Sequence, residues 1–172
     1  MHQELHVNVI DTRTPASAIR AAEREARNGP TENLSVTQQW SMDRICRRIL
    51  ERANQQGGGL GVVRLISHGN SGFVQLGSGL TSQSVRDFQL LRGRFVGRYP
   101  KIEVHACGVL SGQPVTLARP TGTIDLSSAG QALMQSLANA AQVLVIAAYD
   151  VQDADGRMRF EGPIRHFRPR GG

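Results

Sequence analysis

The sequence predicts an α/β fold in which helices cover both faces of a mostly parallel sheet. Segments with the pattern of strands alternate with segments that have the pattern of helices along the chain. The strand predicted at 143–148 is apolar throughout, as is typical of parallel sheets that are buried on both faces. Right-handed crossovers between such strands place helices on both faces. The 172 residues suit one domain, 1–172, with its core motifs in 60–150.

The N-terminal part is predicted to hold one strand and two helices. Apolar and polar residues alternate over 5–9, which is the period of a strand. A helix is predicted over 14–27, because a threonine that can cap it is followed directly by proline. Residues 28–40 are expected to form a loop. Apolar residues at helical spacing then predict an amphipathic helix from residue 41 to the three glycines at 57–59.

The remainder of the chain repeats the alternation of strand and helix. Glycine, proline and polar residues separate the apolar segments and mark the turns between them. The predicted elements are strand 60–67, a short strand at 73–76, a helix from 81 or 82 with Val85, Phe88 and Leu91 on one side, strand 101–106, loop 111–128, a helix with Leu133, Leu137 and Ala141 facing inward, strand 143–148, and a basic hairpin or tail at 157–172.

The composition excludes several classes of protein. The formal charge is +6, but no nucleic-acid-binding motif accompanies the arginines, so no nucleic acid partner is expected. No apolar run is long enough for a membrane span, and the N-terminus lacks the pattern of a signal peptide. A cytoplasmic location is therefore expected, and secretion by a route without a signal stays open. For the same reason Cys46 and Cys107 are expected to be free thiols.

Two residues with reactive side chains follow predicted buried strands directly. His68 comes after strand 60–67, and Cys107 comes after strand 101–106. Ligands of open α/β sheets bind beyond the carboxyl ends of the strands, so both side chains are expected at one edge. An imidazole beside a thiol makes the nucleophilic thiolate available near neutral pH. The sequence therefore predicts a dyad of histidine and cysteine.

The segments Val62 to Gly69 and Ile102 to Gly108 resemble the motifs of the caspase-like cysteine peptidases. In that superfamily, one apolar strand ends in His-Gly and a later strand ends in Ala-Cys or Gly-Cys. It includes caspases, legumain, gingipains and the autoprocessing domains of bacterial toxins. The toxin domains, and related bacterial domains with a Ser-His-Gly turn, are the most similar. The resemblance implies a three-layer sandwich fold and the activity of a cysteine endopeptidase, which could also process its own chain. It implies no metal or other cofactor.

The resemblance also implies a role for each candidate residue. His68 would be the general base or ion-pair partner, and Cys107 would be the nucleophile that forms a thioester. The backbone N–H groups of Gly69 and Cys107 would stabilise the oxyanion. Asp150, after the last predicted core strand, would bind a basic side chain of a protein or peptide substrate. The toxin domains are activated by an inositol polyphosphate, so an anionic activator is a candidate ligand of the arginine-rich C-terminus.

Other interpretations stay open at this level. Val109 and His105 stand where caspases have glycine and glutamine, so a true caspase is not expected. The chain could instead be an inactive interaction module of the same fold, which binds a protein partner or an anion. Asp150 also suits a turn, and Cys46 suits the core of its helix. His105 is a candidate second base. A zinc site of Cys46, His68, His105 and Cys107 lacks the close paired spacing of structural sites.

Overall fold

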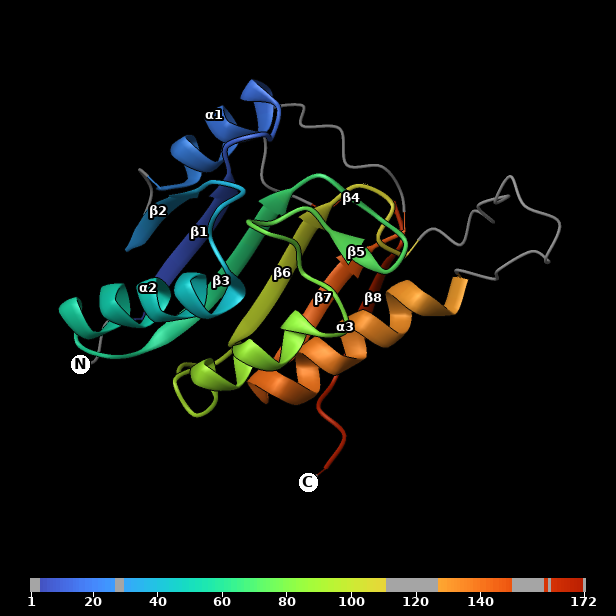
Figure 1. The fold of residues 1–172 in the computed structure, drawn as a ribbon. Coiled ribbons are helices and arrows are strands. Elements are labelled where there is room, and N and C mark those ends of the chain that lie inside the picture. Colours follow the sequence, from blue (N-terminus) through green and yellow to red (C-terminus); the bar gives the residue numbers. More distant parts are fainter. Residues whose placement is uncertain (1–3, 27–29, 111–126, 150–159, 161, 172) are drawn as a thin grey trace, which may run out of the picture.

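Six strands form the central sheet of the protein. The computed structural model describes residues 4–26, 30–110, 127–149, 160 and 162–171. The strands lie in the order β2-β1-β3-β6-β7-β8, all parallel except β8, which is antiparallel to β7 (Figure 1). Their bounds are β1 Leu5–Asp11, β2 Thr31–Val36, β3 Leu60–Ser67, β6 Lys101–Ala106, β7 Leu144–Ala148 and β8 Ile164–Phe167.

Helices cover both faces of this sheet. Helix α1 (Ala16–Ala26) packs Ala22 against Ile10 and Ile66 in a small apolar cluster on one face. The opposite face belongs to the main core, together with α2 (Met42–Gln55), the 3₁₀ helix η1 (Ser84–Leu91) and α3 (Ser127–Ala141). The predicted α/β class, with a mostly parallel sheet between two helical layers, is therefore confirmed.

The strand order creates a switch point between β1 and β3. From β1 the chain first passes to β2 on one side, and then to β3 on the other side. In sheets of this type the crevice outside the carboxyl ends at the switch point is the usual place for a ligand. The turn from β1 into α1 and the residues that follow β3 both lie at this edge (Figure 1).

Several predicted boundaries differ from the structure. The expectation of a loop over 28–40 was wrong, because Thr31–Val36 forms the edge strand β2. Only Leu34 and Val36 of this strand are buried, so its alternation is short and mostly polar. Val85, Phe88 and Leu91 are buried as predicted, but they lie on a 3₁₀ helix. The predicted loop 111–128 overlaps the start of α3 at Ser127, and its residues 111–126 lie outside the described residues.

The chain around the strands is fixed by turns and caps. The side chain of Ser41 accepts a hydrogen bond from the Arg44 N–H at 3.2 Å and caps α2. Two very short strands, β4 (Gly69–Asn70) and β5 (Phe73–Val74), form an antiparallel hairpin immediately after β3. None of the helices in the described part of the chain combines the length and the apolar character needed to cross a bilayer.

Candidate functional site

The pairing of β3 with β6 brings the ends of the two motif strands together. Ser67, the last residue of β3, pairs with Ala106, the last residue of β6. His68 and Cys107 are therefore the next residues on two neighbouring strands, at the carboxyl edge of the sheet. If the alternation of side chains continues past the strand ends, both residues, two positions after Ile66 and His105, fall on the face that holds α1. His68 is exposed and Cys107 is partly exposed.

Gly69 allows the turn after β3 to approach the turn after β6. A Cβ atom at this position would lie 2.9 Å from the Ala106 Cβ and 3.2 Å from the Cys107 carbonyl oxygen. Contacts this short exclude a side chain unless the backbone shifts. The Gln75 N–H donates to the His68 carbonyl at 2.8 Å, so by antiparallel alternation the N–H of Gly69 points away from β5.

The His68 ring is held by the turn that precedes α1. Its Nε2 atom lies 3.1 Å from the carbonyl oxygen of Arg13. Because a carbonyl oxygen only accepts hydrogen bonds, this contact places the ring proton on Nε2. The other nitrogen of the neutral ring, Nδ1, is then the acceptor that can take a proton from a neighbouring group.

Asp11 and Arg13 fix this turn, and neither was predicted from the sequence. The buried carboxylate of Asp11 accepts hydrogen bonds from the Arg13 N–H at 3.0 Å, from Arg13 Nε at 2.7 Å and from the Gly77 N–H at 2.8 Å. The Arg13 guanidinium also donates to the Gly77 carbonyl at 2.7 Å. The two residues therefore tie the β1–α1 turn to the segment after β5. A signal was present, since an aspartate that ends an apolar strand suits a turn.

The electrostatics of Asp11 follow from these contacts. Burial raises the pKa of the Asp11 carboxyl, but hydrogen bonds from Arg13 and Gly77, with the charge of Arg13, outweigh burial. The pKa of Asp11 consequently lies below its usual value. A carboxylate that stays ionised keeps the turn, and with it the Arg13 carbonyl, in one position.

A row of buried polar side chains crosses the sheet on the α1 face, below the site. Arg64 on β3 donates from Nε to Glu103 on β6 at 2.9 Å, and from Nη1 to Asn8 on β1 at 3.3 Å. Lys101 Nζ lies 2.8 Å from Glu103 Oε1, and His105 Nε2 lies 3.3 Å from Glu103 Oε2. Burial raises the pKa of Glu103, but these partners outweigh it and lower the pKa to about 2.

His105 belongs to this row. Besides its contact with Glu103, its ring stacks on Phe160 with the ring centroids 4.4 Å apart. His105 is buried, with 8% of the surface of the residue exposed. These contacts hold the imidazole below the edge where His68 and Cys107 lie. We therefore interpret His105 as a residue that supports β6.

The remaining candidates are separated from the site. Cys46 lies on the buried side of α2 in the main core, and burial raises the pKa of its thiol. The sheet separates Cys46 from His105, so the zinc alternative with all four residues does not form. Within the described ranges, no three histidine, cysteine, aspartate or glutamate side chains gather to hold a metal ion. Asp150 lies outside the described residues, as do residues 157–159 of the basic C-terminal segment.

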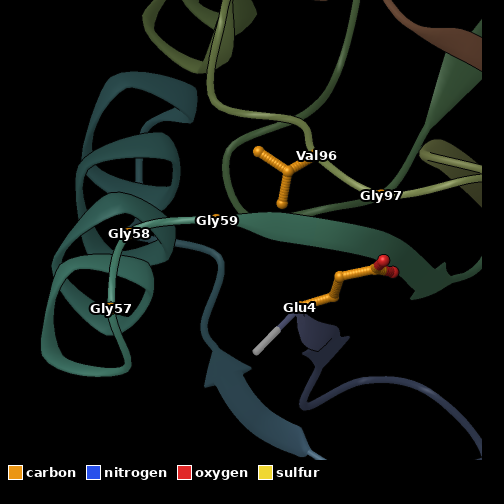
Figure 2. A pocket seen from close by; sticks show the side chains of 6 residues that line it. All are labelled: Glu4, Gly57, Gly58, Gly59, Val96 and Gly97. Atoms are coloured by element: carbon orange, nitrogen blue, oxygen red, sulfur yellow. The ribbon is translucent and has the colours of Figure 1, made fainter. Parts of the chain in front are cut away.

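A hollow of about 370 Å³ lies at the opposite edge of the sheet. Its lining includes Glu4, Val96, Gly97 and the three glycines 57–59 (Figure 2). These glycines lead into the amino end of β3, whereas His68 follows its carboxyl end. The hollow is therefore separate from the candidate site.

The chain matches no protein-family model, and no curated protein and no solved structure matches it significantly. The resemblance to caspase-like peptidases thus depends on the motifs that end in His68-Gly69 and Cys107-Gly108. The fold provides a sheet edge where these motifs meet.

Proposed function

We propose that the chain is a cysteine endopeptidase of the caspase-like type, with His68 and Cys107 as its dyad. One observation supports this most directly. The paired residues Ser67 and Ala106 end neighbouring parallel strands, and the imidazole and the thiol are on the residues that follow them. This is the edge, beside the β1–β3 switch point, where open α/β sheets usually bind ligands.

The first half of the proposed reaction forms a thioester. The thiol proton passes to Nδ1 of His68, while Nε2 stays hydrogen-bonded to the Arg13 carbonyl. The thiolate of Cys107 then attacks the carbonyl carbon of the peptide bond, and the oxyanion is stabilised by the N–H groups of Gly69 and Cys107. When the C–N bond breaks, the imidazolium gives its proton to the leaving amine.

The second half releases the acid product. His68 accepts a proton from a water molecule, and the resulting hydroxide attacks the thioester carbonyl. The C–S bond breaks, and the thiolate of Cys107 is restored. The substrate is a protein or peptide, including a segment of this chain in a self-processing reaction. Asp150 remains the proposed selector of a basic side chain, and the cytoplasm remains the proposed location.

Alkylation of the thiols tests the proposal against an inactive interaction module. We expect iodoacetamide to label Cys107 of the native protein at pH about 6.5, where ordinary thiols with a pKa of about 8.5 react slowly. Cys46 is buried and should react only after unfolding, so intact mass should record a single label. His68→Ala should slow the labelling at this pH. Labelling that is slow at pH 6.5 and unaffected by His68→Ala would favour the interaction module.

Asp11→Asn should impair the dyad through the Arg13 carbonyl. The amide keeps the shape of the side chain but no longer balances the Arg13 guanidinium, so the β1–α1 turn loses its fixed position. We expect kcat for a cleaved peptide to fall about tenfold with little change in KM, because the residue positions His68 and does not touch the substrate.

Asp43→Asn is the matched control for this substitution. Asp43 forms an exposed ion pair with Arg47 on α2, with 2.9 Å between Oδ2 and Nε. Loss of this ion pair should lower the free energy of unfolding by a few tenths of a kcal/mol, as is typical of exposed ion pairs on helices, and leave kcat unchanged. Equal kinetics for Asp11→Asn and the wild type would show that the turn does not position His68.

A further inference from the structure

We propose that strand β8, with the groove between it and α3, binds an acidic peptide segment that adds to the sheet as a further strand. This surface is made by Ile164–Phe167, the following residues 168–170 and one side of α3. The proposal concerns binding alone and does not depend on the activity of Cys107.

The outer edge of β8 presents backbone groups for such pairing. Within the described residues, no strand lies beyond β8 in the sheet. The Tyr149 N–H donates to the Pro163 carbonyl at 3.1 Å, which marks this pair as hydrogen-bonded. Because bonded and non-bonded pairs alternate in antiparallel ladders, the N–H and C=O groups of Ile164 and His166 point away from β7. Both side chains are exposed, Ile164 by 43%.

The groove beside this edge is basic. It has a volume of about 580 Å³, and the residues that line it on β8 and after it include Arg165, His166 and Arg170. Among the residues that the structure describes, the lining from α3 consists of serine, glutamine and alanine, and no aspartate or glutamate takes part. Cationic groups with this neutral lining favour an anionic partner.

Hydrogen bonds hold the groove in shape. Gln135 Nε2 donates to the Arg168 carbonyl at 2.8 Å, and the Arg170 N–H donates to Asn139 Oδ1 at 2.9 Å. Arg165 Nη1 donates to Gln131 Oε1 at 2.6 Å. The segment after β8 is thus fixed along α3, and the partner does not have to order it on binding.

Charge and geometry together select an acidic peptide. A second copy of this chain paired along β8 would bring Arg165 and His166 against the same basic residues, at a net charge of +6 per chain. A small polyanion would pair with the arginines but leave the outward backbone groups of Ile164 and His166 unpaired. An extended peptide with carboxylates on alternate residues satisfies both sets of groups.

Fluorescence anisotropy with a labelled peptide of alternating glutamate and valine, about eight residues long, tests this proposal. We expect saturable binding to the full chain, and the same binding to Cys107→Ala. The double variant Arg165→Gln, Arg170→Gln should weaken it about tenfold. Both side chains are exposed, and the backbone contact of Arg170 with Asn139 does not need its guanidinium group. Arg20→Gln, an exposed arginine on α1, should leave binding unchanged.

Backbone methylation separates strand addition from simple anion binding. Methyl groups on one set of alternate peptide amides should abolish binding, since that set faces β8, whereas methylation of the other set should be tolerated. Binding that withstands both methylation patterns and is displaced by tripolyphosphate would reduce the surface to an anion site and overturn the proposal. Equal weakening by Arg20→Gln, or no binding at all, would overturn it as well.

Discussion

Cys107→Ala should abolish peptide cleavage, with a fall in kcat on the order of 10⁴-fold or more. Alanine has no atom that can attack the substrate carbonyl, so neither the thioester nor its hydrolysis can occur. Residual turnover would come only from substrate binding and from the N–H groups that stabilise the oxyanion. The measurement is the initial rate on a library of fluorogenic peptides that vary the residue before the cleaved bond, or on the chain itself if it processes itself.

Cys46→Ala is the matched control, because it removes the other thiol of the chain. Cys46 lies on the buried side of α2, and truncation there should cost about 1 kcal/mol of stability without changing kcat. Circular dichroism and thermal unfolding should show that Cys107→Ala remains folded. Full cleavage by a folded Cys107→Ala protein would show that Cys107 is not the nucleophile. Loss of cleavage in Cys46→Ala would show that cleavage depends on this core residue.

The sequence was sufficient for those parts of the fold that depend on local patterns. The strand predicted at 60–67 has the bounds of β3, and the one at 101–106 has the bounds of β6. Long apolar runs with clear turns on both sides define such central strands. The edge strand β2 was missed because only two of its side chains are buried, which leaves a weak pattern between two loops.

The supporting residues of the site could not be predicted in the same way. Asp11 acts through Gly77, which is 66 positions further along the chain, and Arg64 pairs with Glu103 across 39 positions. Such pairs depend on which strands are neighbours and on their register, and local patterns do not contain this information. The position of His68 and Cys107 at one edge of the sheet could be predicted, because each directly follows a strongly apolar strand and the general rule for parallel sheets was enough.

Glu103→Gln should destabilise the protein by about 3 kcal/mol or more. Glu103 is 8% exposed. Its carboxylate is surrounded by Arg64, Lys101 and His105, which lower its pKa to about 2. A neutral amide leaves the buried Arg64 guanidinium without its acidic partner on β6, and removal of one member of a buried ion pair is strongly destabilising. Urea unfolding at pH 7 measures the loss. Glu51→Gln, which breaks an exposed pair with Arg48, should change stability by less than about 0.5 kcal/mol.

The pH dependence identifies the charge of Glu103 as the cause. Its pKa is lower in the folded protein, at about 2, than the ordinary value of 4.5, so its stabilisation is fully present above pH 4.5. The stabilisation is lost as the pH falls through this interval toward 2, and the difference in pKa corresponds to about 3 kcal/mol. The difference in stability between the wild type and Glu103→Gln should therefore shrink between pH 4.5 and 2. A difference that stays constant across this interval would assign the effect to packing, since packing does not titrate.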